Sequence, residues 1–232
     1  MLTREDLEHD LLRKTYEQHR HAVSMVPEDE FHASLERVLE PWDPAHDLWI
    51  FGYGSLIWNP LFHYVEKQRV AIHGFHRSFC LRSRLGRGSV ENPGLMLGLD
   101  FGGCCNGVAF RIAAKQVRHE LTLVWRREMV LGSYAPRWVN ARNGQHKVTA
   151  IAFVVNHNHP HYVGKLPRET VIKTLATAHG RFGSGADYLY QTVDCLANHG
   201  IDDAYLSKLR AEVMIATHGV HHAIEECPEI GA

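Results

Sequence analysis

Long apolar runs and an excess of one charge sign are both missing from this chain of 232 residues. No segment approaches the roughly eighteen uninterrupted apolar residues of a membrane-spanning helix, so such a span is excluded. The first ten residues are acidic and lack the apolar region of a signal peptide, and we therefore expect a cytoplasmic protein. Lys and Arg number 25 against 26 for Asp and Glu, which leaves no basic excess for binding nucleic acid.

Cysteine is scarce, and its spacing fits no metal site. The five cysteines are an odd number, and none of them forms a Cys-x-x-Cys motif. This usage predicts reduced thiols rather than a disulfide framework or a structural zinc site. The five residues are Cys80, Cys104, Cys105, Cys195 and Cys227.

Histidine, in contrast, is abundant, with 18 residues. The densest stretch places His157, His159 and His161 in Asn-His-Asn-His-Pro-His-Tyr. A metal site and a polar loop are both compatible with this stretch. Pro160 and the alternating asparagines favour the loop, because they mark a turn and no second cluster has the ligand spacing of zinc sites. We therefore expect no bound metal.

An apolar content of 45% suits a globular core, and the length of the whole chain allows one large domain or two small ones.

The N-terminal part of the chain carries helical signals. Thr3 and Asp6 fit a capping box, so a helix is expected from there to about His21. We assign residues 1–46 to a helical arm that packs on the main domain. Three prolines break up its linking segment, at Pro27, Pro41 and Pro44.

The central part of the chain, from 47 to about 155, consists mostly of predicted strands. Leu48-Trp49-Ile50-Phe51 is a short apolar run that ends at Gly52, which is typical of a buried strand. One helix is expected between about Ala114 and Leu131. The other predicted strands cover 69–72, 78–82, 107–112, 135–141 and 147–155.

Helical patterns return after Pro167. Strands followed by helices, without regular alternation, indicate an α+β domain with a mainly antiparallel or mixed sheet. We assign this domain to residues 47–218, and we assign 219–232, with His221 and His222, to a solvated C-terminal tail. The late helices are predicted over 169–179, 187–198 and 202 to about 217.

An acidic residue lies on the apolar face of the helix predicted over 114–131. Glu128 occupies a position where the apolar stripe calls for a residue such as leucine. Arg126 and Arg127 precede it directly, but we expect them to point elsewhere, so that no basic residue of this helix pairs with Glu128. The stripe consists of Val117, Leu121, Val124 and Leu131.

Burial gives Glu128 a chemical use. An ionised, unpaired carboxylate in the interior costs several kcal/mol, and desolvation raises its pKa toward the range of a base that works at neutral pH. Glu128 is therefore a candidate general base. Two alternatives stay open: a core glutamate paired with an arginine from another element, or a helix whose apolar face has a different phase.

A tyrosine between two glycines follows the first predicted strand directly. Gly52 and Gly54 on either side of Tyr53 let the backbone turn and leave main-chain N–H groups for an anion or an oxyanion. A tight turn that only ends the strand is the alternative. A phosphate-binding loop is excluded, because Ile57 stands where its third glycine belongs and no Gly-Lys-Ser/Thr follows. The Gly-x-Ser-x-Gly motif of hydrolases is also absent.

Two further groups of polar residues have weaker patterns. The run of Arg82, Arg84 and Arg87 fits a solvated face better than a carboxylate clamp. Tyr162, directly after the histidine-rich turn, is either a surface aromatic residue or a hydroxyl that lines a pocket.

Three motifs together resemble the ChaC family of glutathione-specific γ-glutamylcyclotransferases. They are Phe-Gly-Tyr-Gly-Ser-Leu-Ile-Trp at 51–58, Asn-Gly-Val-Ala-Phe at 106–110 and Arg-Glu-Met-Val-Leu-Gly-Ser-Tyr at 127–134. Their order and spacing match, and the similarity extends from about Leu48 to Leu196. Animal members have Phe-Trp-Gln where this chain has Phe79-Cys80-Leu81, which leaves the contacts to the rest of the peptide substrate open.

The resemblance implies an α+β fold with a mixed β-barrel and flanking helices. It also implies cleavage of glutathione to 5-oxoproline and cysteinylglycine, without cofactor or metal. Glu128 then corresponds to the general acid/base of the family, and Tyr162, in Tyr-x-Gly, to a further residue of the site. The residues that correspond to the γ-glutamyl-binding loop are Phe51, Gly52, Tyr53, Gly54, Ser55 and Leu56.

Two other functions remain open for such a site. A cyclotransferase for other γ-glutamyl amino acids or γ-glutamylamines closes the same ring, so the sequence separates it poorly from a glutathione enzyme. A non-catalytic sensor of γ-glutamyl ligands keeps the pocket but has no need of Glu128. The presence of Glu128 favours the enzyme.

Overall fold

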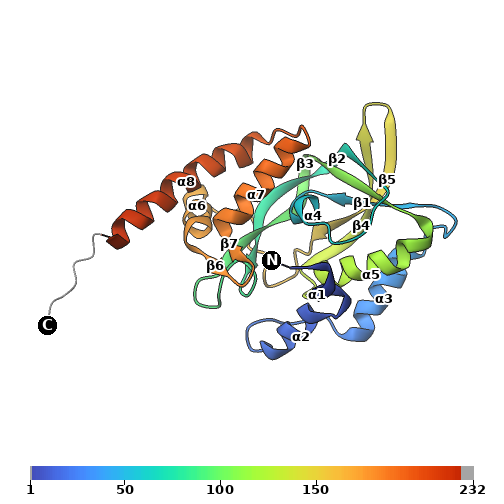
Figure 1. Cartoon of the computed structure of the whole chain (residues 1–232), viewed down its shortest axis with the longest axis horizontal. Coiled ribbons are helices and arrows are strands. Elements are labelled where there is room, and N and C mark those ends of the chain that lie inside the picture. Colours follow the sequence, from blue (N-terminus) through green and yellow to red (C-terminus); the bar gives the residue numbers. More distant parts are fainter. Residues whose placement is uncertain (1, 226–232) are drawn as a thin grey trace.

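The computed structural model describes residues 2–225, with side chains as far as Thr217. Five strands close into a barrel in the order β1-β3-β2-β4-β5 (Figure 1). β1 pairs in parallel with β5 and antiparallel with β3, so the barrel is mixed, as predicted. The strands are β1 (Leu48–Gly52), β2 (Glu66–Ser83), β3 (Gly94–Ile112), β4 (Tyr134–Asn143) and β5 (His146–Val155).

The two longest strands are longer than predicted. The segments predicted at 69–72 and 78–82 belong to one strand, β2, which pairs with β3 almost throughout. The register shifts between His73 and Phe75, next to Gly74 at φ +85°, and this irregularity interrupts the alternation of the sequence. Within β3, a Cβ on Gly98 would lie 2.1 Å from Val155, so only glycine fits where β5 crosses.

The N-terminal arm is three short helices rather than one. α1 (Arg4–Glu8) begins with the predicted capping box of Thr3 and Asp6, and α2 (Leu11–Gln18) follows after Asp10, whose φ of +52° ends the first helix. The prediction of a linking segment broken up by prolines is wrong, because a helix, α3 (Glu28–Leu39), lies between Pro27 and Pro41. Prolines flank this helix rather than break it, since Pro27 is its N-cap residue.

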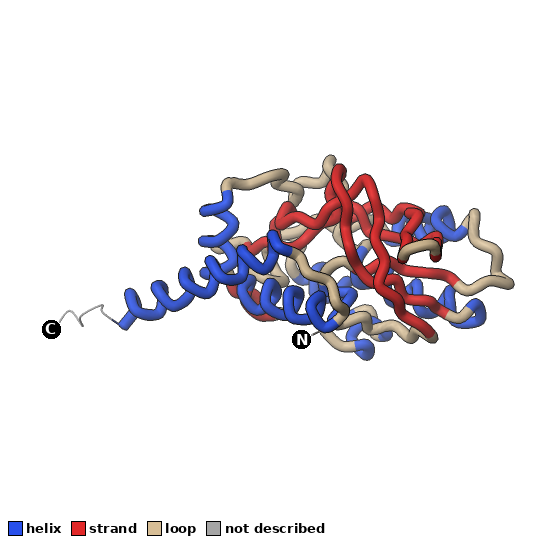
Figure 2. The backbone as a smooth tube through the Cα atoms, turned by 90° about the horizontal axis from the view of Figure 1, so that it is seen from above, coloured by secondary structure: helices blue, strands red, loops and turns tan. Residues whose placement is uncertain are grey.

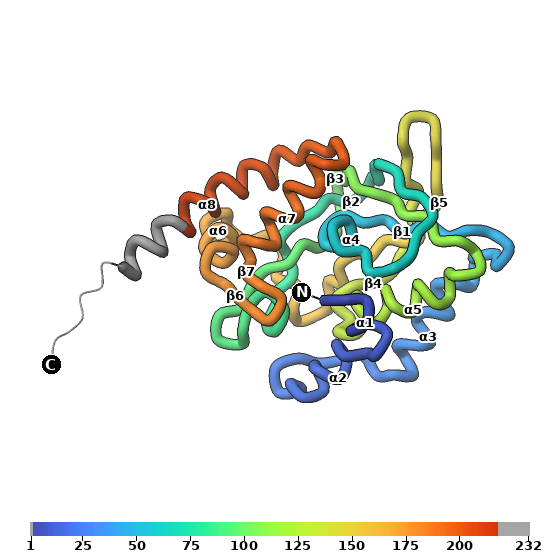
Figure 3. Tube along the Cα trace, in the orientation of Figure 1, coloured from blue at the N-terminus to red at the C-terminus, as the bar shows by residue number. Residues whose placement is uncertain are grey.

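The other helices cover the barrel from two sides. α6, α7 and α8 contact one another on one side, whereas α5 lies on the other side with the arm (Figures 1 and 2). The chain starts close to the barrel, where the Asn59 side chain donates to the Leu2 carbonyl at 3.1 Å (Figure 3). The bounds are α4 (Ser55–Trp58), α5 (Val117–Glu128), α6 (Arg168–Thr177), α7 (Gly185–Asn198) and α8 (Ala204–Glu225), with a 3-10 turn at Ala114–Gln116 and two-residue strands β6 (His179–Gly180) and β7 (Gly183–Ser184).

The core fills the barrel and the seam between the barrel and α5. Its largest fully buried side chains include Trp125, Phe51, Phe110 and Phe153. Among the described residues, no helix is both long enough and apolar enough to span a bilayer. The side chains of His221 and His222, in the predicted tail, lie outside the part of the chain that the structure describes.

Candidate active site

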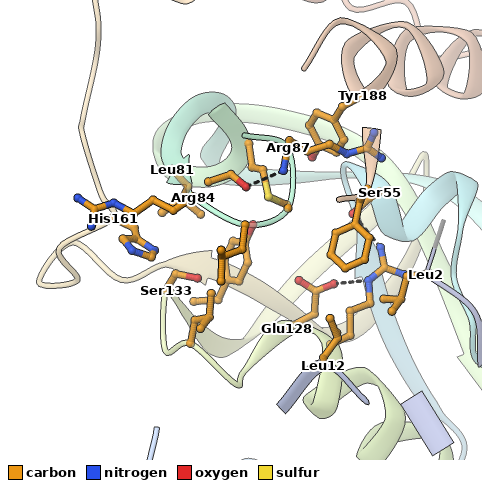
Figure 4. A pocket seen from close by; sticks show the side chains of 18 of the residues that line it. Leu2, Leu12, Ser55, Leu81, Arg84, Arg87, Glu128, Ser133, His161 and Tyr188 are labelled. Carbon is orange, nitrogen blue, oxygen red and sulfur yellow. Dashed lines mark hydrogen bonds and ion pairs between the residues drawn. The ribbon is translucent and has the colours of Figure 1, made fainter. Parts of the chain in front are cut away.

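Glu128 and the loop after β1 line the same space. A small cavity is bounded by Glu128 and by Tyr53, Gly54, Ser55 and Leu56, and it adjoins a larger cavity of about 140 Å³ (Figure 4). The structure therefore brings together Glu128 and four of the six predicted loop residues. Phe51 is fully buried in the barrel core, and neither it nor Gly52 lines the two cavities.

The loop is held by a buried hydroxyl and by close packing. The Tyr53 hydroxyl donates to the Phe153 carbonyl of β5 at 2.9 Å. A Cβ on Gly54 would lie 3.2 Å from the Tyr188 hydroxyl, so a larger residue there would narrow the cavity. Gly54 is the N-cap of α4, and no described side chain caps this helix. As first-turn groups, the amides of Ser55 and Leu56 have no acceptor within the helix.

Glu128 is the last residue of α5, so the helix is shorter than predicted and Leu131 lies beyond its end. The side chain is 11% exposed, and Arg127 Nε lies 2.9 Å from its Oε1. The prediction that Arg127 points elsewhere is therefore wrong. Residues adjacent in a helix lie about 100° apart, which suggests that their side chains diverge. The Arg127 side chain is long enough to reach the carboxylate of Glu128, the next residue, at the end of the helix.

Two opposing effects act on the Glu128 carboxyl. Burial raises its pKa above the ordinary value, and the Arg127 guanidinium lowers it through charge and hydrogen bonding, with burial the larger effect. The C-terminal end of a helix adds a partial negative charge, which also disfavours an ionised carboxylate. Glu128 is thus set to exchange a proton nearer neutral pH than an exposed glutamate.

Arg127 joins the candidate base to the loop. Its guanidinium donates to the Ser55 hydroxyl at 2.8 Å and to the Asn59 carbonyl, in addition to its contact with Glu128. Because one planar group makes all three contacts, a shift of α4 would also move the guanidinium relative to the Glu128 carboxylate. Arg127 therefore positions Glu128 relative to Ser55.

Arg77, on β2, holds the backbone of the loop after β1. Its side chain is 4% exposed; Nε donates to the Tyr53 carbonyl at 3.0 Å, and the other nitrogens donate to the Asn106 carbonyl and to Asp203. Sequence reasoning did not single out this residue. Within β2 it stands on a polar position of an irregular strand, and no spacing signal marks it.

We predict that Arg77→Met lowers the free energy of unfolding by about 3 kcal/mol, because removing one partner of a buried ion pair leaves the other groups without compensation. Urea unfolding would measure this. Arg142→Met, at an exposed position, should change it by less than about 0.5 kcal/mol. A loss below about 1 kcal/mol for Arg77→Met would contradict the structural role.

Arg87 contradicts the expectation of a solvated arginine run. It is 6% exposed, whereas Arg82 is exposed as expected and Arg84 is half-buried. The Arg87 guanidinium lies 5.4 Å from the centre of the Tyr188 ring and 5.8 Å from that of Trp58. No described carboxylate lies within ion-pair distance of it, although it lines the Glu128 cavity.

The turn that carries Arg87 has a local signal in the sequence, because Arg87 stands between two glycines. A Cβ on Gly88 would lie 2.0 Å from the Gly94 backbone, so the chain is closely packed at this turn. The glycines indicate the compact turn, whereas the burial of the Arg87 side chain is seen only in the structure. Burial lowers the pKa of this guanidinium, which still remains a cation at neutral pH.

Tyr162 lies away from Glu128. Its hydroxyl donates to Asp100 at 3.0 Å, and it lines a different cavity, together with Asp100 and Arg77. His157, of the histidine-rich stretch, contacts the same Asp100 at 2.7 Å. The described residues contain no group of three or more His, Cys, Asp or Glu placed to hold a metal ion.

The cysteines of the described residues are free thiols, and none lines the Glu128 cavities. Burial raises the pKa of Cys80 to about 12 and that of Cys105 to about 11. Both therefore remain protonated at neutral pH, which makes them poor nucleophiles.

Comparison with known proteins indicates the family of this chain. Residues 48–216 match the family described as ChaC-like protein. A protein of Escherichia coli (strain K12) named glutathione-specific gamma-glutamylcyclotransferase is 38% identical over 183 residues, which cover 78% of this chain and 79% of that protein. Glutathione-specific gamma-glutamylcyclotransferase 1 of Rattus norvegicus is 34% identical over 160 residues, 67% of this chain and 72% of its own length.

The fold also has solved counterparts. The crystal structure of a yeast gamma-glutamyl cyclotransferase specific to glutathione superposes with a TM-score of 0.69 at 22% identity, and it covers 75% of this chain and 98% of its own. At that identity the likeness concerns the fold. Together with the match over 48–216, these observations mean that the chain belongs to the ChaC-like family.

Proposed function

We propose that this chain cleaves glutathione by closing a ring within its γ-glutamyl group, which gives 5-oxoproline and cysteinylglycine. The observation that carries the proposal is a buried glutamate with a raised pKa in one cavity with the Tyr53–Leu56 loop. The names of the similar proteins from Escherichia coli and Rattus norvegicus support the choice of glutathione.

The first step is a proton transfer to Glu128. The carboxylate removes a proton from the α-ammonium group of the substrate, and the free amine attacks the γ-carbonyl carbon of the same residue. A carbon–nitrogen bond forms and closes a five-membered ring. Both reacting groups belong to one molecule, so the protein mainly has to hold the folded conformer, a type of placement that contributes up to about 7 to 11 kcal/mol in favourable cases.

The second step breaks the bond to the cysteinyl nitrogen. Protonated Glu128 gives its proton to this departing nitrogen as the tetrahedral centre collapses to the 5-oxoproline carbonyl. The ring nitrogen still carries two protons after its attack, and it gives up one of them, which ends on the amine of cysteinylglycine so that this product leaves as an ammonium ion. The carboxylate is thereby restored, and no water, metal or cofactor is consumed. Backbone amides of the loop stabilise negative charge on the substrate, either on the oxygen that develops at the γ-carbon or on a carboxylate.

Arg87 supplies a cation for a substrate carboxylate. Glutathione has two carboxylates, and the cavity presents this buried guanidinium without a described acidic partner. Charge-assisted hydrogen bonds from arginine to a carboxylate are short and about twice as strong as neutral ones. We therefore assign Arg87 to substrate binding, beside the Tyr53–Leu56 loop.

The pH dependence of the reaction follows from the groups around Glu128. Because Glu128 must be ionised to accept the first proton, kcat/KM falls as pH drops through its pKa. Arg127→Gln removes the cation that lowers this pKa, so the acid limb of the profile should move to higher pH. Arg127→Lys should move it less. An acid limb that stays in place or moves to lower pH in Arg127→Gln would contradict this account.

A product assay separates glutathione cleavage from the alternative activity. Equal concentrations of glutathione and γ-glutamyl-alanine are incubated with the protein, and 5-oxoproline is measured by mass spectrometry. Faster release from glutathione supports the proposal, whereas preference for γ-glutamyl-alanine indicates a cyclotransferase for other γ-glutamyl amino acids. Absence of product from both, with ligand binding retained, indicates a sensor.

We also propose a cytoplasmic location, which suits the free thiols.

A further inference from the structure

Part of the Glu128 cavity is built by residues outside the family match. The match begins at residue 48. Four side chains of the arm nevertheless line the larger cavity together with Glu128, namely Leu2, Leu12, Tyr16 and Val23. Figure 4 shows Leu2, Leu12 and Glu128 at one side of this cavity, with Arg84 and His161 at the other.

A buried ion pair fixes the arm to α5. Arg4 makes two contacts with the Glu120 carboxylate, at 2.7 and 3.0 Å, and Glu120 is 1% exposed. The same carboxylate accepts from the His63 backbone N–H at 2.9 Å. Because a buried carboxylate is costly without its partners, Arg4 holds α1 in place against the barrel.

Further contacts join the arm to the end of α5 that carries Glu128. Arg126 donates to the carbonyls of Leu7 and Glu8, at 2.9 and 2.8 Å. Leu7 and Leu12 are buried in one apolar cluster with Leu123 of α5. The arm is thus packed on the catalytic helix through charge, hydrogen bonds and apolar contact.

We propose that the N-terminal arm is a wall of the reaction cavity, in which Leu12 and Tyr16 keep water away from the Glu128 carboxylate and Leu2 closes the side next to the loop. This inference rests on the proposed function and extends it to the arm. Leu12 and Leu2 are positioning residues, because they act on the reaction through Glu128.

The groups around Glu128 make this wall consequential. Arg127 is the charged group in contact with the carboxylate, and the cavity is also lined by Arg82, Arg84, Arg87 and His161. Burial lowers the pKa of His161 to about 4, so its ring is neutral at neutral pH. The charge of Glu128 acts in turn on the phenols of Tyr16 on α2, Tyr53 after β1, Tyr134 on β4 and Tyr188 on α7. Burial raises the pKa of Tyr16 and of Tyr188 to about 12, so these phenols are neutral during catalysis. Apolar cover is therefore what opposes ionisation of Glu128.

The first test opens the wall at one position. In Leu12→Ala, water gains access to Glu128, so the acid limb of the kcat/KM profile on glutathione should move to lower pH by about half a unit or more. Turnover should fall about tenfold, because proton transfer and water exclusion are both impaired. Leu11→Ala is the matched control, since Leu11 is the preceding residue, is 40% exposed and lines neither cavity. Leu12→Met, which conserves volume, should restore the profile.

The second test uses the opposite sign. Leu2→Asp places a negative charge in the same cavity, which disfavours ionisation of Glu128, so the acid limb should move to higher pH. Leu2 is only partly buried at the edge of the apolar cluster that contains Leu12, so this variant should fold even where Leu12→Ala does not. General loss of packing cannot move the acid limb in two opposite directions.

A titration without substrate separates this inference from the proposed function. The Glu128 carboxyl is followed by infrared difference spectroscopy against Glu128→Gln, in the full chain and in both variants. Opposite shifts of its midpoint in Leu12→Ala and Leu2→Asp support the wall even if glutathione is not cleaved. Midpoints unchanged from the wild type in both folded variants would overturn the inference.

Discussion

Glu128→Gln is expected to reduce turnover on glutathione at least about a hundredfold, the lower bound typical of general acid/base catalysis. The amide keeps the size of the carboxyl group and can still accept from Arg127 Nε, so the fold and the approximate affinity for substrate should persist. Steady-state kinetics with detection of 5-oxoproline measure the loss. A KM close to that of the wild type would place the effect in the chemical step.

The control for this variant is the same substitution at an exposed glutamate. Glu169→Gln, on α6, removes one negative charge far from the cavities and should leave turnover unchanged. Near-normal turnover in a folded Glu128→Gln would show that another group transfers the proton. The assignment of Glu128 would then be wrong, whatever the substrate.

Arg87→Met is expected to lower kcat/KM on glutathione at least about thirtyfold, mainly through a higher KM. Removing one partner of a desolvated charge pair costs about 2 to 5 kcal/mol, and 2 kcal/mol corresponds to about thirtyfold. Methionine keeps an apolar stem against Tyr188 and Trp58, so the packing of the cavity should survive.

Substrate esters test the Arg87 assignment directly. Esterifying the carboxylate that Arg87 binds should penalise the wild type but not Arg87→Met, and separate esters of the glutamyl and glycine ends show which carboxylate this is. Arg142→Met is the control for loss of one exposed positive charge. If Arg87→Met stayed within about threefold of the wild type, the buried cation would have no part in binding.

Glu128 could be found from the sequence because helix periodicity alone exposes it. Val117, Leu121 and Val124 are buried as the stripe predicts, and Glu128 follows on the same face. Its partner could not be found in this way, because the reach of Arg127 depends on where the helix ends. The loop after β1 could be predicted from its two glycines. At Gly54 the structure shows why a small residue is needed there, because the Tyr188 hydroxyl lies close to it.

The arm shows why other features were not predictable. A break at Asp10 depends on a left-handed backbone conformation that its sequence does not demand. The helix at Glu28–Leu39 does have a signal, namely three acidic residues in its first turn after Pro27, but the prolines around it also fit a broken linking segment. Contacts between Leu12 and the Glu128 cavity join residues more than a hundred positions apart, and no local pattern encodes them.

The most direct test of the account is one incubation with glutathione in water enriched in oxygen-18. Ring closure by the substrate's own amine consumes no water, so the wild type should release 5-oxoproline without the heavy isotope, together with cysteinylglycine. Glu128→Gln should release almost none. Glutamate carrying oxygen-18 in its side-chain carboxyl group would reveal hydrolysis by water and would contradict the proposed intramolecular reaction.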